Sequence, residues 1–341
     1  MSYFPWQQSL WQQINRDRSK LPHALLFSGR KGIGKLAFAR ALAQGLLCEA
    51  PQPEGEACGS CLACGWFAQG NHPDFRLVEP EILSESEADA EPKSKTKGKK
   101  PSKQILIEQI RLLSELVNLS SHRNGMRVIL IHPAEAMNLA SANALLKTLE
   151  EPPPRTVIIL VSHQIQSLLP TVRSRCLKIA FPLPSFEQGA SWLAGQGMRS
   201  PESLLAQAGN APLAALDLAD EEIQAARRSL LSQLASPQAF DPVTWAEKNE
   251  KQDLPSLVKW LQQWVYDLLA CHMGTPLRYQ LDYQAEIRVL ASRLNLSEAL
   301  GYQQTLLGAQ KNVHHPLNAQ LFLEQLLLSY ADMFESGLKH G

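Results

Sequence analysis

The sequence lacks three features that would place it in large classes of protein. Its 33 lysines and arginines balance 33 aspartates and glutamates, and this absence of net charge argues against a stand-alone, strongly basic nucleic-acid binder. The first residues hold no positively charged segment followed by an apolar one, so no secretory signal is expected. No apolar run approaches the roughly 18 residues that span a membrane. We therefore expect a cytoplasmic protein with no membrane partner.

Six cysteines are present, and in a reducing cytoplasm clustered cysteines are metal ligands rather than disulfides. Four of them are close in sequence: Cys48, Cys58, Cys61 and Cys64. Four thiolates complete a tetrahedral zinc shell and leave no position for water, so the pattern predicts a structural zinc module over residues 48–64. An iron–sulfur cluster is an alternative, although the further cysteine and proline of the ferredoxin pattern are missing. Metal-free thiols are the other alternative.

Short apolar runs alternate with helical patterns through the first half of the chain. Strands alternating with helices predict an α/β fold, with a parallel sheet that is covered by helices on both faces. From about residue 184 onward the strand patterns fade, and leucine-rich helical patterns continue to the end. The expected strands are the runs at 24–28, 75–78, 128–131, 157–161 and 177–181.

The patterns divide the chain into three expected domains. Residues 1–181 form the α/β domain, residues 182–222 a small helical domain and residues 223–341 a larger helical one. Inside the first domain, residues 84–103 are acidic, then rich in lysine, and almost free of apolar side chains. This composition predicts a disordered surface insertion. A DNA-binding role for its lysines is the alternative.

A glycine-rich segment follows the first expected strand and opens a helix. Residues 29–35, Gly-Arg-Lys-Gly-Ile-Gly-Lys, fit the phosphate-loop pattern G-x-x-x-x-G-K. The loop glycines Gly29, Gly32 and Gly34 allow backbone N–H groups to curl around a phosphate. Lys35 adds a positive charge, and the start of the helix adds its dipole. The segment therefore predicts a phosphate loop.

The residues that would complete an ATPase site are missing. Leu36 stands where a serine or threonine hydroxyl would hold magnesium. His132 and Pro133 follow the strand at 128–131, where aspartate and a catalytic glutamate are needed. Glu135 is nearby in sequence, but its spacing from the strand places it on a different part of the turn. We therefore expect no significant ATP hydrolysis, and ATP binding by this loop is left open.

Several segments together resemble one known family. Residues 144–153, Ala-Leu-Leu-Lys-Thr-Leu-Glu-Glu-Pro-Pro, look like the signature helix of bacterial clamp-loader ATPases, and Ser174-Arg175-Cys176 looks like their S-R-C motif. The inserted cysteines, His72-Pro73-Asp74 and the leucine-rich run at 318–328 are similar to further features of that family. The resemblance to clamp-loader subunits of the AAA+ type implies an AAA+ P-loop domain, a helical lid and a helical collar for oligomerisation.

The degenerate nucleotide residues decide which clamp-loader subunit is most similar. The motor subunits gamma and tau keep the hydroxyl and the carboxylates that Leu36, His132 and Pro133 replace here. The delta subunit is less similar, because it usually lacks the cysteine module and S-R-C. The chain resembles the catalytically silent end subunit of the DNA polymerase III clamp loader. That resemblance implies membership of the polymerase assembly, without polymerase or significant ATPase activity in this chain.

The resemblance also implies partners and a role for Arg175. Gamma or tau subunits and a delta subunit would complete a hetero-pentameric ring that loads a sliding clamp onto primer-template DNA in the replisome. Arg175 would act as an arginine finger on the ATP of the adjacent motor subunit. Arg173, two residues away, is the alternative if the register of the motif is different.

Two other functions are compatible with parts of the sequence. A hydrolysis-competent ATPase of the gamma/tau type would turn over ATP alone, and the residues at 36, 132 and 133 argue against it. A zinc-dependent DNA-binding protein would bind DNA strongly without partner subunits. The balanced charge and the lack of a basic recognition helix argue against that function.

Overall fold

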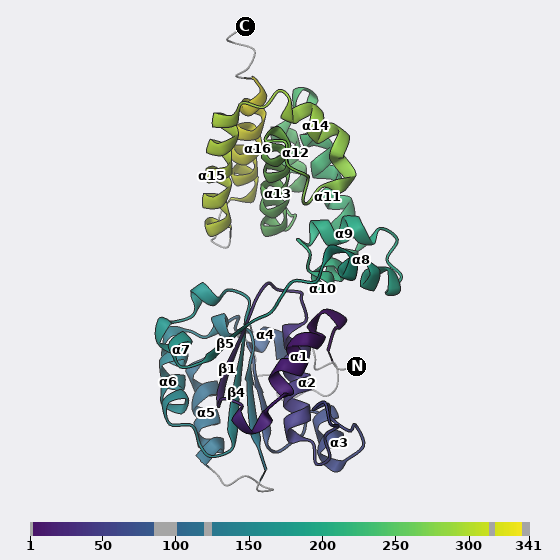
Figure 1. The fold of residues 1–341 in the computed structure, drawn as a ribbon. Helices are drawn as coiled ribbons and strands as arrows, with labels where there is room; N and C mark the ends of the chain where they lie inside the picture. The colour runs from purple at the N-terminus through teal and green to yellow at the C-terminus, as the bar shows by residue number, and fades with distance from the viewer. Residues whose placement is uncertain (1–2, 85–100, 119–124, 314–317, 336–341) are drawn as a thin grey trace. The chain divides into compact units, whose positions relative to one another are not determined.

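The computed structural model of the chain describes residues 3–84, 101–118, 125–313 and 318–335. Most of the segment predicted to be a disordered insertion, residues 84–103, lies outside the described residues. The chain divides into two compact units, residues 1–188 and 189–341, and each is described by itself (Figure 1). Among the described residues, no helix has the combination of length and hydrophobicity that crossing a bilayer requires.

The first unit is built on one sheet of five strands, and all neighbouring strands run parallel. The strand order is β2-β3-β4-β1-β5, so β2 and β5 form the edges. Each strand lies within one residue of a run predicted from the sequence, and the expected parallel α/β sheet is confirmed. The strands are β1 Ala24–Ser28, β2 Phe75–Val78, β3 Arg127–Ile131, β4 Thr156–Ser162 and β5 Leu177–Ala180.

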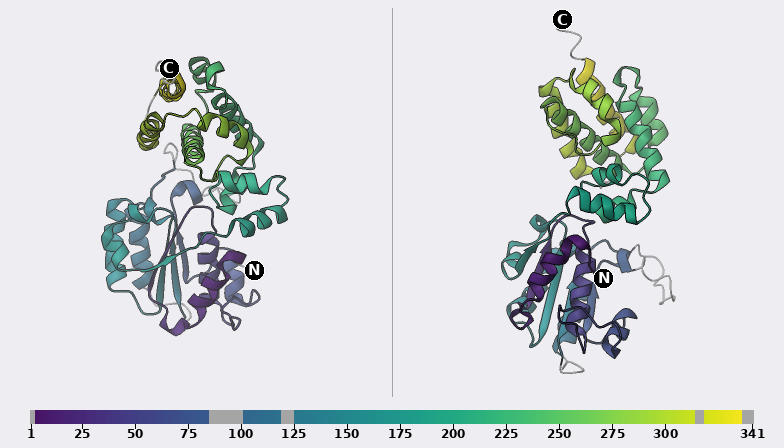
Figure 2. Two further views of the ribbon diagram at one scale, coloured as in Figure 1. Left: turned by 45° about the horizontal axis from the view of Figure 1, so that its top comes forward. Right: turned by 45° about the vertical axis from the view of Figure 1, so that its right-hand side comes forward.

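Helices cover both faces of this sheet (Figures 1 and 2). One face carries α1 and α2, with α3 packed beside α2, and the opposite face carries α5, α6 and α7. The short helix α4 follows β2. The bounds are α1 Gln8–Asn15, α2 Lys35–Leu47, α3 Leu62–Ala68, α4 Glu81–Ser84, α5 Ile107–Asn118, α6 Leu139–Glu150 and α7 Pro170–Ser174.

The central strands are buried on both sides. Every residue of β4 is buried, and successive side chains of β1 point to opposite faces. Leu26 belongs to the core cluster between the sheet and α6, whereas the ring of Phe27 contacts that of Phe38 in α2, with 5.7 Å between centroids. Burial of both faces explains why these strands are continuous apolar runs rather than alternating patterns.

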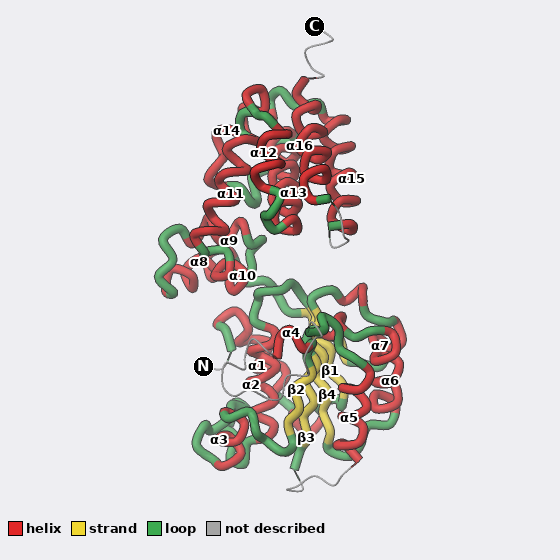
Figure 3. Tube along the Cα trace, turned by 180° about the vertical axis from the view of Figure 1, so that it is seen from behind, coloured by secondary structure: helices red, strands yellow, loops and turns green. Residues whose placement is uncertain are grey.

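The second unit contains helices and loops but no strand among its described residues (Figure 3). The helical patterns predicted from residue 184 onward are confirmed. The helices are α8 Phe186–Gly195, α9 Pro201–Gln207, α10 Pro212–Asp217, α11 Glu221–Leu234, α12 Pro242–Asn249, α13 Leu254–His272, α14 Gln284–Ala291, α15 Leu296–Asn312 and α16 Ala319–Glu335.

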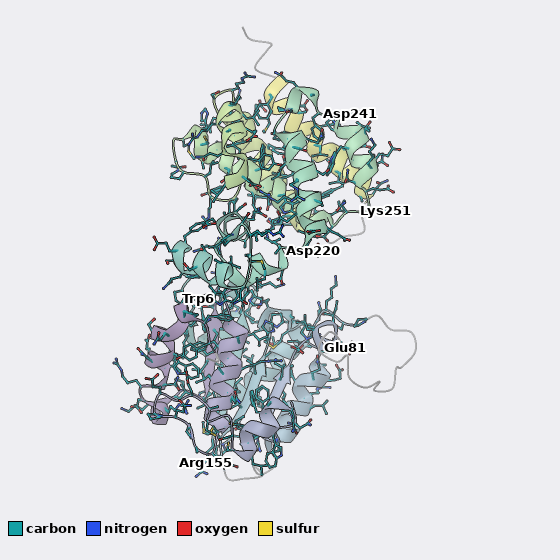
Figure 4. The ribbon with its side chains drawn as sticks, turned by 90° about the vertical axis from the view of Figure 1, so that its right-hand side faces the viewer. Trp6, Glu81, Arg155, Asp220, Asp241 and Lys251 are labelled. Carbon is teal, nitrogen blue, oxygen red and sulfur yellow. The ribbon has the colours of Figure 1, made fainter. Side chains whose placement is uncertain are left out.

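Several of these helices begin at an aspartate cap. Asp220 and Asp241, both labelled in Figure 4, precede α11 and α12, and Asp253 precedes α13. Each carboxylate accepts backbone N–H groups of the first turn, which satisfies donors that have no partner inside the helix. Pro242 in the first turn of α12 suits a position where no N–H is needed.

Two hydrophobic clusters fill the second unit. A small one lies among α8, α9 and α10, and a large one surrounds α13, whose Trp264 is fully buried. Polar side chains join the two: Gln263 Nε2 donates to the backbone oxygen of Gln207 at 2.8 Å, and Gln224 Nε2 donates to Gln207 Oε1 at 2.8 Å. Both clusters lie in one compact unit, and the division into domains at 182–222 and 223–341 stays a prediction.

Candidate functional site

The predicted phosphate loop joins β1 to α2, and its lysine points into the loop. Gly32 and Gly34 adopt φ angles of 82° and 90°, a left-handed backbone that favours glycine. Lys35 is only 2% exposed, and its ammonium group donates to the backbone oxygens of Gly29, at 2.6 Å, and of Arg30. Burial lowers the pKa of Lys35 to about 8, against the opposing effect of the Glu135 charge. The carbonyl groups of the loop therefore bind the ammonium group that a phosphate would bind.

The N-terminal segment covers this loop from outside. The 3₁₀ helix Pro5–Gln7 lies against Ile33, whose backbone oxygen accepts from Trp6 Nε1 and Gln7 Nε2, both at 3.0 Å. The ring of Phe4 is so close to Gly34 that a Cβ at residue 34 would lie 2.3 Å from it. Phe4 and Trp6 stack with 4.9 Å between centroids. An aromatic cap therefore occupies space beside the phosphate-loop glycine.

Two histidines lie at the carboxyl ends of β3 and β4, where the magnesium residues of an ATPase would lie. The Nε2 atoms of His132 and His163 are 3.2 Å apart. Burial lowers the pKa of each to about 4, aided by the other imidazole for His132 and by Lys35 for His163. Both rings are therefore neutral near pH 7. Neutral imidazoles supply neither the oxygen ligands that magnesium prefers nor a carboxylate base.

Glu135 lies closer to this site than its spacing from the strand suggests. It belongs to the 3₁₀ helix Ala134–Ala136, and its two carboxylate oxygens accept the backbone N–H of His163 at 2.9 and 3.2 Å. Its charge also acts on Lys35. The carboxylate is thus engaged by the chain itself, at the end of the neighbouring strand. The sequence places Glu135 on a different part of the turn from the end of β3, and the structure has it in a separate 3₁₀ helix after Pro133.

The four clustered cysteines meet at one point. Their sulfur atoms all lie within 4.8 Å of one another, with separations of 3.8 Å for Cys48–Cys61, 4.0 Å for Cys58–Cys64 and 3.6 Å for Cys48–Cys64. A disulfide needs about 2.05 Å. A tetrahedron of sulfurs about 2.3 Å from a zinc ion has edges of about 3.8 Å, so the spacing fits that metal.

Local structure gives each thiol its place. Cys48 directly follows α2, and Cys61 caps the start of α3, where its sulfur accepts the N–H of Cys64 at 3.4 Å. Cys58 is partly exposed, and hydrogen bonds from the backbone N–H groups of Ser60 and Cys61 lower its pKa to about 6. These bonds stabilise a thiolate, which is the form that binds metals. The predicted ligand set is thus assembled in space.

The zinc-module segment is fastened to the helices that flank it. Arg18 donates to the backbone oxygen of Gly45 in α2 at 3.1 Å, to that of Gly55 in the module, and to Asn15 Oδ1 at 2.7 Å. Gly45 allows this approach, because a Cβ there would lie 2.3 Å from the Gly55 oxygen. Trp11 of α1 adds a second attachment, because its Nε1 donates to the backbone oxygen of Glu54 at 3.0 Å.

Arg175 ends α7 and is exposed, and its side chain is held by its own chain. Its guanidinium lies 2.5 Å from a Glu150 carboxylate oxygen and donates to the Thr171 backbone oxygen at 3.0 Å. Arg173 makes a different contact, with Gln166 Oε1 at 3.0 Å. Cys176, the next residue of the S-R-C motif, is buried, and burial raises its pKa to about 11.

Arg175 lies away from this chain's own phosphate loop. The loop follows the carboxyl end of β1, whereas Arg175 precedes the amino end of β5, which pairs in parallel with β1. The structure therefore gathers Lys35, Glu135 and the two histidines at the carboxyl ends of the strands. It places Arg175 toward their amino ends.

Comparison with known proteins decides the family. The sequence model described as "DNA polymerase III, delta subunit" matches residues 6–185, and the one described as "DNA polymerase III, delta subunit, C terminal" matches residues 221–332. The DNA polymerase III subunit delta' of Pseudomonas aeruginosa is 36% identical, over 97% of this chain and 98% of its own. The chain belongs to the DNA polymerase III delta' family.

A second curated relative agrees with this membership, and a solved structure is similar to the chain at low identity. The subunit delta' of Escherichia coli K12 is 28% identical, over 99% of this chain and 98% of its own. Among solved structures, a DNA polymerase III gamma subunit-related protein from Thermotoga maritima is 16% identical, covers 95% of this chain and 99% of its own, and has a TM-score of 0.45. The DNA polymerase III subunit family expected from the sequence is confirmed.

Several residues of this delta' family site were not found by sequence reasoning. Phe4, Trp6 and Gln7 contact the loop although they lie about 30 positions before it in the sequence. His163 contacts His132 because the two follow the neighbouring strands β4 and β3. The only sequence signal for the cap is the aromatic segment Tyr3-Phe4-Pro5-Trp6 before α1. Glu150, the partner of Arg175, lies in the signature helix but carries no local signal for that contact.

Proposed function

We propose that this member of the delta' family is the end subunit of a bacterial clamp loader, which donates Arg175 to the ATP site of an adjacent motor subunit and hydrolyses no ATP itself. The partners proposed are gamma or tau subunits and a delta subunit in a hetero-pentameric ring. Through the complex, the chain would act on a sliding clamp and primer-template DNA. The proposed place of action is the replisome in the bacterial cytoplasm.

The observation that carries the proposal is the position of Arg175. It is exposed, and it belongs to an S-R-C motif. It lies toward the amino ends of the strands, whereas the chain's own phosphate loop lies at their carboxyl ends. An arginine in that position is available to a second chain. Its planar guanidinium stays charged and binds phosphate oxygens as a fork. A finger of this kind accelerates phosphoryl transfer by about 10³–10⁵, or about 4–7 kcal/mol of barrier.

The chemistry of the loop supports the absence of hydrolysis. Leu36 has no oxygen for magnesium, and His132 and Pro133 stand where carboxylates are needed. Lys35 is bound to carbonyls of its own loop, and Glu135 is bound to a backbone N–H. Phosphate binding by Lys35 would require its ammonium group to leave these two acceptors.

We also propose that Cys48, Cys58, Cys61 and Cys64 hold a structural zinc ion. The sulfur spacing fits a tetrahedral site, and four protein ligands leave no position open for a substrate or water. The zinc would fix the module between α2 and β2. Residues 182–222 would form the lid, and residues 223–341 the oligomerisation collar.

The proposal is tested by copurification followed by an ATPase assay. The chain is mixed with motor and delta subunits, and the complex is isolated with a sliding clamp and primed DNA. We expect a stable complex whose ATP hydrolysis is stimulated by DNA, and no turnover by this chain alone at saturating ATP. Turnover by the isolated chain would establish the motor-type alternative, and strong DNA binding without partners would establish the zinc-dependent DNA-binding alternative.

A further inference from the structure

The ion pair between Arg175 and Glu150 connects the S-R-C motif to the end of the signature helix. Glu150 is the last residue of α6, and Arg175 directly follows α7. The separation of 2.5 Å is short for a pair whose side chains are 35% and 51% exposed. Exposed pairs of this kind contribute little to folding stability. The main effect of this ion pair is therefore on the position of the Arg175 guanidinium.

Both partners stand on anchored backbone. Leu149, the neighbour of Glu150, is 2% exposed, and Cys176, the neighbour of Arg175, is 8% exposed. The two belong to one core cluster. His23 at the start of β1 also hydrogen-bonds the Leu149 backbone oxygen, at 3.1 Å, which ties the last turn of α6 to the sheet. Because both backbones are fixed by the core, forming the pair costs less side-chain entropy than an ordinary surface pair.

The contacts of the guanidinium leave part of it available. An arginine has five N–H donors in a planar fork. Here one terminal nitrogen faces Glu150 and the other donates to Thr171, at the carbonyl four residues earlier. Two acceptors on different elements fix the plane of the group, and the remaining donors are left for a phosphate. A group held in this way before its target arrives loses less freedom on binding.

We propose that Glu150 is a positioning residue for Arg175: its carboxylate holds the guanidinium plane in the orientation from which the finger meets the neighbouring subunit's ATP. This inference rests on the proposed function and adds a residue that does not itself touch ATP. It also separates the two adjacent glutamates of the signature helix, because Glu150 faces Arg175 and Glu151 is not part of the pair.

The test uses the reconstituted clamp loader with four variants of this chain: Glu150→Ala, Glu150→Gln, Glu151→Ala as the matched control, and Arg175→Ala. DNA-stimulated ATP hydrolysis is measured against ATP concentration. Glu150→Ala is expected to lower kcat by about two- to fivefold with KM for ATP unchanged, the range of an exposed ion pair. Glu150→Gln keeps an oxygen acceptor without the charge, so its kcat is expected between those of Glu150→Ala and the unchanged chain. Glu151→Ala is expected to behave as the unchanged chain.

A double variant identifies the route of the effect. Adding Glu150→Ala to Arg175→Ala is expected to cause no further loss, because the positioning residue then has nothing to position. An equal loss with and without Arg175, or a Glu150→Ala rate equal to that of Glu151→Ala, overturns the inference while the finger assignment stands. If Arg175→Ala itself leaves hydrolysis unchanged, the proposed function fails, and this inference fails with it.

Discussion

At the phosphate loop, single side chains differ from those that ATP hydrolysis needs, while the loop pattern itself is kept. Leu36 follows Lys35 without a hydroxyl, and His132 replaces the carboxylate at the end of β3. Each change alone would weaken magnesium binding, and together they remove its ligands from two sides. His132 and His163 lie at the carboxyl ends of β3 and β4, and burial lowers the pKa of each well below the usual value for histidine. The pair therefore gives the first unit a measurable dependence on pH.

The two histidines predict a loss of stability in mild acid. Their pKa values are about 4 in the folded chain, against about 6.5 when unfolded. The unfolded chain thus takes up protons first as the pH falls, and the pair's contribution declines from about pH 6.5 to 4. The expected loss is about 2–4 kcal/mol for the pair. Urea unfolding at pH 7.0 and 4.5, followed by hydrogen exchange in β3 and β4 peptides, measures it.

His132→Gln is the variant that assigns this effect, and it is expected to remove about half of the acid-dependent loss. His272→Gln, which lies in the second unit, serves as the control and should leave the pH dependence of β3 and β4 as it is. An unchanged slope in His132→Gln would contradict the assignment to this pair.

The parts of the site that could be predicted are those with a fixed local spacing. Gly29 to Lys35 and the run Cys58-x-x-Cys61-x-x-Cys64 are each confined to one loop, so sequence reveals them directly. The contacts of Lys35 with its own loop, of His163 with His132 and of Glu150 with Arg175 could not be predicted in this way. They depend on which side chains the fold brings together, and no spacing along one segment encodes them.

At the scale of elements, the hydrophobic pattern predicted the strands of the sheet better than it predicted the short helical elements around the site. The central strands β1, β3 and β4 are continuous apolar runs that are buried on both faces, so their limits are sharp in the sequence. Helix α6 begins at Leu139 because the side chain of Asn138 caps it. The 3₁₀ helix over the phosphate loop was missed, because three residues are too few for a periodic pattern.

This capping element predicts a specific sensitivity at Gly34. Gly34→Ala is expected to destabilise the first unit by about 2–3 kcal/mol, because it adds backbone strain at φ 90° and a clash with the Phe4 ring. Gly70→Ala is the control: Gly70 has φ 73° but open space, so only strain of about 1 kcal/mol is expected. Urea unfolding of both variants measures the difference, and equal losses would show that the cap does not pack on the loop.

The cysteine module predicts a metal-dependent element that the assembly tolerates losing. Cys61→Ser should lower the zinc content and increase proteolysis near α3, because Cys61 is both a ligand and the cap of that helix. Complex formation should persist. Cys271 lies outside the cluster, so the variant Cys271→Ser should have the same zinc content as the unchanged chain. Elemental analysis of the purified variants gives the readout, and full metal content in Cys61→Ser would remove the zinc proposal.

For the whole molecule, the proposed function divides one reaction between two chains. This chain would offer a permanently charged side chain at its surface, and its residues at 36, 132 and 133 lack the groups that hold magnesium and activate water. A neighbour would supply ATP, magnesium and the base. Such a division makes hydrolysis depend on assembly, because the barrier is lowered only when the two surfaces meet.

The most direct measurement is single-turnover ATP hydrolysis by the rebuilt complex carrying Arg175→Ala or Arg175→Lys. We expect both variants to assemble and both to slow hydrolysis at the adjacent site by about 10³ or more, because lysine cannot reproduce the planar fork. Arg173→Ala, the neighbouring arginine, should leave the rate nearly unchanged. Normal hydrolysis with Arg175→Ala, or a large loss with Arg173→Ala alone, would contradict the account.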